Sequence, residues 1–143
     1  MKAQLEPGLK LTKTLLPCLR SAFTRGAFVD AADNRGRAFL FERLENPAVF
    51  IEVIHTAPDK IRGNHVHQNC VETLNVVSGK LVFYQLCDCP EKHVLEQVMK
   101  SGDTVVTQKG VPHALQTLEE TEIVVFFDKD PRKDRDRVQI LAF

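Results

Sequence analysis

Three histidines and one glutamate are spaced so that they could bind one metal ion together. His65 and His67 lie two residues apart, so in a β-strand both side chains would point to the same face. Glu72 begins a run in which every second residue is apolar, so its side chain would lie on the same face of the strand as apolar side chains. Burying a carboxylate on such a face costs free energy unless a cation compensates its charge. His113 comes much later, directly after a proline. Three imidazoles and one carboxylate suit a divalent transition metal and leave positions open for water or substrate.

The elements that must position these residues are short strands that follow one another from residue 37 onward. Each candidate is rich in Val, Ile, Phe or Thr, and turn residues separate most of them. This pattern predicts an all-β sandwich or barrel with antiparallel pairing. No sustained helical stripe with caps follows residue 37, so an α/β fold is disfavoured. The predicted strands are 37–43, 49–55, 72–77, 80–87, 93–99, 103–108 and 121–127.

Two turns are expected to bring the candidate ligands together. Gly79 would allow the strand that begins at Glu72 to return as a hairpin with the next strand. Gly110 and Pro112 would set the turn that delivers His113 to the same cavity. A small barrel can hold one ligand among its inward side chains.

Length and composition indicate one globular domain. The chain has 143 residues, with 19 basic and 19 acidic side chains, and 43% of its residues are hydrophobic. These values exclude a disordered chain, a collagen-like chain and a coiled coil. We expect an N-terminal arm and first strand region over 1–36 and a barrel over 37–143. A net charge of zero offers no broad electrostatic reason to bind nucleic acid or an anionic membrane.

The ends of the chain bear on location and partners. No apolar run approaches the roughly 20 residues of a spanning helix, and the N-terminus lacks the pattern of a signal peptide, so we expect a cytoplasmic protein. Leucines in segment 9–19 predict a short helix or an arm that covers the barrel or a partner subunit. This segment and the apolar segment 138–143 would suit a homodimer. Segment 128–137 is charged at every position but its proline and predicts a solvated loop.

The cysteines offer a weaker signal. We expect all four to be reduced thiols, as is usual in a cytosolic chain. One residue between two cysteines is not the usual zinc spacing, which favours ordinary loop or strand residues at 87–89. Cys70 lies between two candidate ligands, but the four ligands above already account for the site, so we expect it not to bind the metal. His55 and His93 are assigned no role. The four cysteines are Cys18, Cys70, Cys87 and Cys89.

The order of these residues resembles the two motifs of the cupin family. The first motif reads here as His65-Val-His67, four residues, Glu72, six residues and Gly79. The second reads as Gly102, five residues, Gln108-Lys-Gly110, Val-Pro and His113. The resemblance covers about half of the chain and implies a small jelly-roll β-barrel with one divalent metal at its centre. The ligands that it implies are His65, His67, Glu72 and His113. The same four side chains accept Zn, Mn, Fe, Ni or Co, so the metal stays open.

The run from Arg62 to His65 resembles the Arg-Gly-x-His motif of sugar-nucleotide cupins, which include dTDP-4-keto-sugar epimerases and ketoisomerases. This resemblance implies a metal-dependent isomerase or epimerase that acts on a keto-sugar or a similar small carbonyl substrate. Arg62 would bind a phosphate or carboxylate, and Glu72 would be a ligand or the base. Either Tyr84 or Gln85 must face the cavity, because successive side chains in a strand alternate. Tyr84 is the expected catalytic residue of the two.

Other classes of function stay open on the sequence alone. Single-domain cupins of this size include polyketide cyclases and Fe-dependent dioxygenases, and the same ligand set fits them. A non-catalytic cupin that binds a small molecule is the third class. The fold does not decide between them, because one such fold carries many activities.

Overall fold

The computed structural model describes residues 28–43, 49–87, 89–90 and 93–141, and its regular elements there are all β-strands. Within these ranges no helix is long and apolar enough to cross a membrane. The expected helix or arm over 9–19 lies outside the described residues. The strands are β1 (Phe28–Asp33), β2 (Gly36–Arg43), β3 (Val49–Thr56), β4 (Ile61–Val66), β5 (Glu72–Ser78), β6 (Lys80–Leu86), β7 (Val94–Lys100), β8 (Thr104–Thr107), β9 (His113–Thr117), β10 (Thr121–Phe127) and β11 (Asp136–Arg137).

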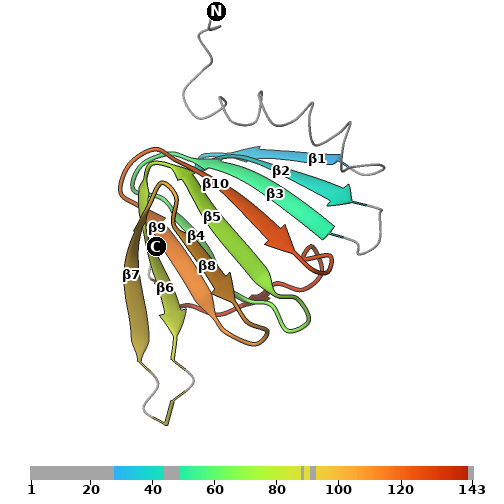
Figure 1. Cartoon of the computed structure of the whole chain (residues 1–143). Helices are drawn as coiled ribbons and strands as arrows, with labels where there is room; N and C mark the ends of the chain where they lie inside the picture. The colour runs from blue at the N-terminus through green and yellow to red at the C-terminus, as the bar shows by residue number, and fades with distance from the viewer. Residues whose placement is uncertain (1–27, 44–48, 88, 91–92, 142–143) are drawn as a thin grey trace, which may run out of the picture.

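The strands form two antiparallel sheets that face each other (Figure 1). One sheet has the order β1-β2-β3-β10-β5-β8, and the other has the order β11-β4-β9-β6-β7. The all-β, antiparallel jelly-roll prediction is confirmed. In the described part of the chain, no pair of strands joins the two sheets, so they form a sandwich that is not closed into a barrel.

The strands that the sequence predicted agree with the structure to within one residue at each end. Four further strands are not among the predicted ones: β1, β4, β9 and β11. β4 and β9 are short, and they carry Gly, Asn and His in place of a regular apolar alternation. The predicted boundary between the N-terminal arm and the barrel lies at residue 36. In the structure, β1 lies before this boundary and pairs with β2 as a hairpin.

The hydrophobic core fills the space between the sheets. In β5, the inward positions are occupied by Glu72, Leu74 and Val76, and the residues between them are partly exposed. Strand β10 lies in the middle of the larger sheet and is buried along almost its whole length. The buried cluster consists of Phe50, Ile54, Cys70, Leu74, Val76, Leu81, Phe83, Met99, Leu115, Ile123, Val125 and Phe127. Glu72 is therefore the charged end of an apolar row.

Gly79 forms a corner between the two sheets. Strand β5 pairs with β10 and β8, whereas β6 pairs with β7 and β9, so the predicted hairpin between β5 and β6 is wrong. The partners of β5 come from distant parts of the chain, which a local turn signal does not reveal. Gly79 has a φ of 86°, and a Cβ on it would lie 2.7 Å from the Cα of Thr121. The corner needs glycine both for its backbone angle and for this close approach.

We predict that Gly79→Ala destabilises the fold by roughly 3 kcal/mol, since it adds a backbone clash to a left-handed conformation. Gly102→Ala is the matched control: its φ is 94°, but nothing lies within 4 Å of the added Cβ. Gly102→Ala should cost about 1 kcal/mol. Urea unfolding of both variants measures the difference, and equal losses would show that the close approach at Gly79 is unimportant.

Candidate metal centre

Four side chains from both sheets converge between the sheets. His65 on β4 and His113 on β9 belong to the smaller sheet, Glu72 begins β5 of the larger sheet, and His67 follows β4. The Nε2 atoms of His65 and His113 lie 3.1 Å apart. Glu72 Oε2 lies 3.0 Å from Nε2 of His67 and 3.1 Å from Nε2 of His113. One ligand atom from each residue lies within 4.8 Å of the others. The structure thus brings all four predicted ligands together.

A bulge in β4 sets the position of His65. The β4–β9 register shifts between Gly63 and His65, after which His65 stands opposite His113. Gly63 has a φ of 86°, and a Cβ on it would lie 2.9 Å from the carbonyl oxygen of His113, so only glycine lets the two backbones meet. Asn64 has a φ of 55°, and its buried amide hydrogen-bonds the backbone of residues 140–141. The C-terminal segment therefore holds the bulge in place.

Backbone carbonyls orient two of the imidazoles. His67 Nδ1 lies 2.5 Å from the carbonyl oxygen of Asp134, and His113 Nδ1 lies 3.0 Å from that of Val111. A carbonyl can only accept, so each Nδ1 carries the hydrogen, and a neutral ring then turns the lone pair of Nε2 toward Glu72. Acceptor atoms would face one another here, in a buried place, unless a cation lies between them. This donor set fits a divalent transition metal.

The same contacts shift the ionisation of the ligands. With protons rather than a metal ion between the side chains, burial raises the pKa of Glu72, but hydrogen bonds from His113 and His67 outweigh burial, and the pKa lies well below its usual value. Burial lowers the pKa of His113, but the hydrogen bond and charge of Glu72 reverse this, and the pKa is raised. Burial, followed by the charges of His113 and His67, lowers the pKa of His65 to about 3. Its neutral imidazole therefore offers a lone pair at physiological pH.

Asp134 clamps the loop that carries His67. Its buried carboxylate accepts hydrogen bonds from the backbone N–H groups of Gln68 and Asn69, at 2.8 and 2.9 Å. Burial raises the pKa of Asp134, but these hydrogen bonds outweigh it and lower the pKa. The solvated loop expected over 128–137 is thus wrong at this position, because the loop after β4 has N–H groups that need an acceptor.

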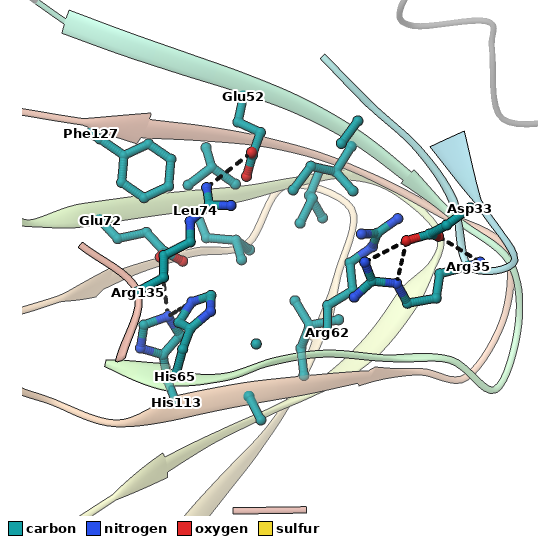
Figure 2. Close-up of a pocket in the computed structure, with 17 residues that line it drawn as sticks. Asp33, Arg35, Glu52, Arg62, His65, Glu72, Leu74, His113, Phe127 and Arg135 are labelled. Atoms are coloured by element: carbon teal, nitrogen blue, oxygen red, sulfur yellow. Dashed lines mark hydrogen bonds and ion pairs between the residues drawn. The ribbon is translucent and has the colours of Figure 1, made fainter. Parts of the chain in front are cut away.

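A cavity of about 240 Å³ lies beside the four ligands (Figure 2). His65, Glu72 and His113 line one end, and apolar side chains such as Leu74 line the middle. Figure 2 shows Arg62 at the other end, on the side of the Asp33–Arg35 pair. The remaining lining residues are Ala38, Glu52, Ile54, Gly63, Ala114, Leu115, Ile123, Val125, Phe127 and Arg135.

Two of the three arginines in the cavity are paired with carboxylates. Arg35 pairs with Asp33, and this hydrogen bond lowers the pKa of Asp33 to about 2. Arg135 pairs with Glu52 at 3.1 Å, beside the histidine end of the cavity. Arg135 belongs to segment 128–137 and is exposed, as expected of a solvated loop, although its side chain also reaches Glu52. Both of these pairs neutralise charge within the cavity wall.

Arg62 is the third arginine and has a different environment. Its Nε donates to Thr56 Oγ1 at 2.5 Å, and one terminal nitrogen lies 3.3 Å from the carbonyl oxygen of His55. Burial lowers the pKa of Arg62 to about 10, so it still carries a charge at neutral pH. Among the described residues, no carboxylate lies within ion-pair distance of it. Its remaining N–H groups are available to an anion in the cavity.

The structure places Tyr84 away from this cavity. In β6, Leu81 and Phe83 belong to the core, so alternation puts Gln85 on the same face as the core residues and Tyr84 on the opposite face. Gln85 stands opposite His113 in the β6–β9 ladder. Neither Tyr84 nor Gln85 is among the residues that line this cavity, and the catalytic role expected of Tyr84 stays a prediction.

The cysteines differ in accessibility and in bonding. Cys70 is buried, and burial raises the pKa of its thiol to about 12, followed by a contribution from its hydrogen bond to Asp134. Cys87 and Cys89 form a disulfide, so the prediction of reduced thiols is wrong for this pair. The sequence spacing alone does not reveal that the hairpin brings their side chains together. Cys18 lies outside the described residues.

The sequence profile of the cupin family, described as Cupin, matches residues 41–141. The chain belongs to the cupin family. This confirms the resemblance drawn from the two motifs around the histidines. No curated protein matches the chain in sequence.

Solved structures show the same fold. CapF, a capsular polysaccharide assembling protein from Staphylococcus aureus, is 22% identical with a TM-score of 0.66, over 81% of this chain and 34% of CapF. A variant of oxalate decarboxylase from Bacillus subtilis is 17% identical with a TM-score of 0.69, over 80% of this chain and 31% of the decarboxylase. The chain thus spans about a third of the length of these neighbours. At these identities the likeness shows the cupin fold alone.

We predict that Asp134→Asn weakens metal binding roughly 10- to 100-fold, as is typical when a residue that supports a ligand is changed. One oxygen of the carboxylate would become an NH₂ group facing a backbone N–H, and the loop of His67 would loosen. Competition with a coloured chelator measures the affinity.

Two further variants serve as controls for this prediction. Asp130→Asn is the matched control, because Asp130 is exposed in the same segment and binds Arg132; it should bind metal like the wild type. His113→Ala removes a ligand and should abolish binding. Wild-type affinity in Asp134→Asn, beside a metal-free His113→Ala, would contradict the supporting role of Asp134.

Proposed function

We propose that this cupin is a metal-dependent enzyme that moves a proton next to the carbonyl of a small anionic substrate. The best-supported reaction is an isomerisation or epimerisation of a keto-sugar or a similar compound. The observation that carries the proposal is the arrangement of the cavity, which has a metal-type ligand set at one end and, at the other, the cation of Arg62, for which the described part of the chain supplies no carboxylate partner.

The size and lining of the cavity support a small substrate. A volume of about 240 Å³ lies below the range of roughly 300–1,000 Å³ that is typical of pockets for drug-sized ligands. Leu74 and the other apolar side chains of the middle can pack against the carbon skeleton of a sugar ring. A nucleotide attached to that ring would extend beyond this volume. The cavity is therefore suited to the reacting ring itself.

Arg62 is suited to bind a carboxylate or phosphate of the substrate. Its contacts with Thr56 and His55 hold the guanidinium in place and leave other N–H groups for a ligand. A half-buried cation with no carboxylate partner among the residues described is costly, and an anionic substrate would relieve that cost. Binding at this end would orient the carbonyl toward the histidine end.

A metal held by His65, His67, Glu72 and His113 would polarise that carbonyl and make the adjacent proton labile. Mn is among the candidates, since the Bacillus subtilis oxalate decarboxylase has Mn(II) centres. The lowered pKa of Glu72 and its two hydrogen bonds favour the role of ligand over that of base.

Glu52 is the carboxylate best placed to take up the proton. It lines the cavity, and Arg135 holds it at the histidine end. Asp33 lies at the other end with Arg35, and its pKa of about 2 makes it a poor base. Glu52 therefore replaces both Glu72 and Tyr84 as the proposed proton carrier. A homodimer and a cytoplasmic location remain part of this proposal.

We predict that the metal-loaded protein exchanges the proton next to the carbonyl with deuterated water, without oxygen. Nucleotide-linked keto-sugars and the free keto-sugars are the substrates to try, and mass spectrometry of the recovered compound measures exchange. Glu52→Gln should slow exchange about 10²- to 10⁴-fold and keep the metal, since it removes only the base. Glu72→Gln should lose both metal and exchange.

Other outcomes point to the other classes. Consumption of oxygen with an aromatic substrate, dependent on iron and without solvent exchange, would identify a dioxygenase. Ring closure of a polyketide would identify a cyclase. A ligand that only raises the melting temperature would identify a binding module. Exchange that is unchanged in Glu52→Gln would leave the metal-dependent activity standing and refute the role of Glu52.

We predict that Arg62→Gln raises KM for an anionic substrate roughly 10- to 100-fold, which corresponds to one lost hydrogen bond to a charged group. The glutamine can still bond Thr56, but it has no charge for the substrate. Arg35→Gln is the control, because Arg35 already pairs with Asp33, and its effect should be smaller. Steady-state kinetics give KM, and a neutral analogue should not distinguish wild type from Arg62→Gln. Equal KM values for the anionic substrate would refute the anion-binding role.

A further inference from the structure

The tip of the β6–β7 hairpin carries a second group of metal-type side chains. Cys87 and Cys89 follow β6, and His93 precedes β7. The ligand atoms of all three residues lie within 4.8 Å of one another, and Cys89 Sγ lies 3.4 Å from Nδ1 of His93. All three residues are at least partly exposed, unlike the buried Cys70. This group is therefore accessible to reductants and to metal ions.

The hairpin backbone holds the group together independently of the disulfide. Leu86 stands opposite Val94 in the last ladder pair, and Cys87 N–H donates to the carbonyl oxygen of His93 at 2.8 Å. Reduction of the disulfide would leave this pairing intact. Both sulfurs would then stay within reach of the imidazole.

The geometry of the reduced group suits a tetrahedral ion. Zinc binds sulfur at about 2.3 Å and imidazole nitrogen at about 2.0–2.1 Å, which places neighbouring S and N ligands roughly 3.6 Å apart. The 3.4 Å between Cys89 Sγ and His93 Nδ1 is close to this value. The two sulfurs would have to move apart on reduction, and side-chain rotation at the exposed tip allows that movement.

Stabilisation of the fold does not account for the disulfide. Its two cysteines are only two residues apart, so it closes a very short loop. In the chain-entropy account, a loop of 15 residues is worth about 3 kcal/mol, and shorter loops are worth less. The hairpin is also already paired up to its tip. An accessible disulfide of this kind is suited to reversible reduction.

We propose that the dithiol form of Cys87 and Cys89, together with His93, is a second metal site that takes Zn²⁺ or a similar soft divalent ion. Three protein ligands leave one position for water. A low-molecular-weight dithiol reduces the disulfide: it gives two electrons and two protons to the two sulfurs and becomes a disulfide itself. The metal ion then displaces both thiol protons and binds the thiolates. A low-molecular-weight disulfide reverses the step: it takes two electrons from the two thiolates and two protons from water to become a dithiol, Cys87 and Cys89 form their disulfide again, and the ion is released.

Cobalt titration of the full chain tests this site, because thiolate-bound Co²⁺ has a sulfur-to-metal charge-transfer band. We expect the band and one additional equivalent of Co²⁺ per chain in protein reduced with a phosphine, and neither in oxidised protein. His113→Ala empties the first centre and should keep the band, so failure of the two sites can be told apart. Cys87→Ser with Cys89→Ser should lose the band, and His93→Ala should weaken binding at least 10-fold.

Cys18→Ser and Cys70→Ser are the matched controls and should keep the band. If the double serine variant fails to fold, reduced wild type alkylated at Cys87 and Cys89, with the sites assigned by peptide mass, takes its place and should show no band. The proposal is overturned if reduced wild type has no band. It is equally overturned if the band survives alkylation or double substitution.

Discussion

The burial of the Glu72 carboxylate among three imidazoles is the interaction on which the rest of the structure depends. Glu72 stands at the end of an inward-facing row whose other members are apolar, so water cannot compensate its charge. A buried ion of this kind requires a partner of opposite charge and good geometry. A metal ion shared with the three histidines would be that partner, and His65 and His113 would hold it from the opposite sheet. The site therefore also ties the two layers of the sandwich together.

Holding three imidazoles around one carboxylate places demands on the backbone that carries them. The bulge at Gly63 turns β4 so that His65 stands opposite His113, and Asn64 fastens this bulge to the C-terminal segment. Asp134 fixes the loop of His67 from another part of that segment. The C-terminal part of the described chain thus holds both ligand-bearing segments in place, the bulge next to His65 and the loop of His67. The irregular backbone is concentrated where the ligands are, as is common at functional sites.

The parts of this site that were predictable from sequence are the parts with local signals. His65, His67 and Glu72 lie within eight residues, and their spacing in a strand and loop limits where they can point. The contacts of Asp134 and Arg135 were not predicted, because a segment of alternating charges has the same sequence pattern whether it is solvated or packed against the site. Their hydrogen-bond partners also lie more than sixty residues away in the chain. The role of Gly79 was misjudged for the same reason, since strand pairing is decided by distant strands. Tyr84 could be placed only once the register of β6 was known.

The charges that line the cavity add a further constraint. Arg35, Arg62 and Arg135 oppose Asp33, Glu52 and Glu72, so the lining is neutral when the histidines are neutral. A divalent ion would raise its net charge to about +2, with Arg62 at the far end as the cation that no carboxylate of the described ranges pairs with. An anion in the cavity then gains from the metal, and linkage requires the metal to gain equally from the anion. Metal affinity and substrate affinity in this cavity are therefore expected to rise together.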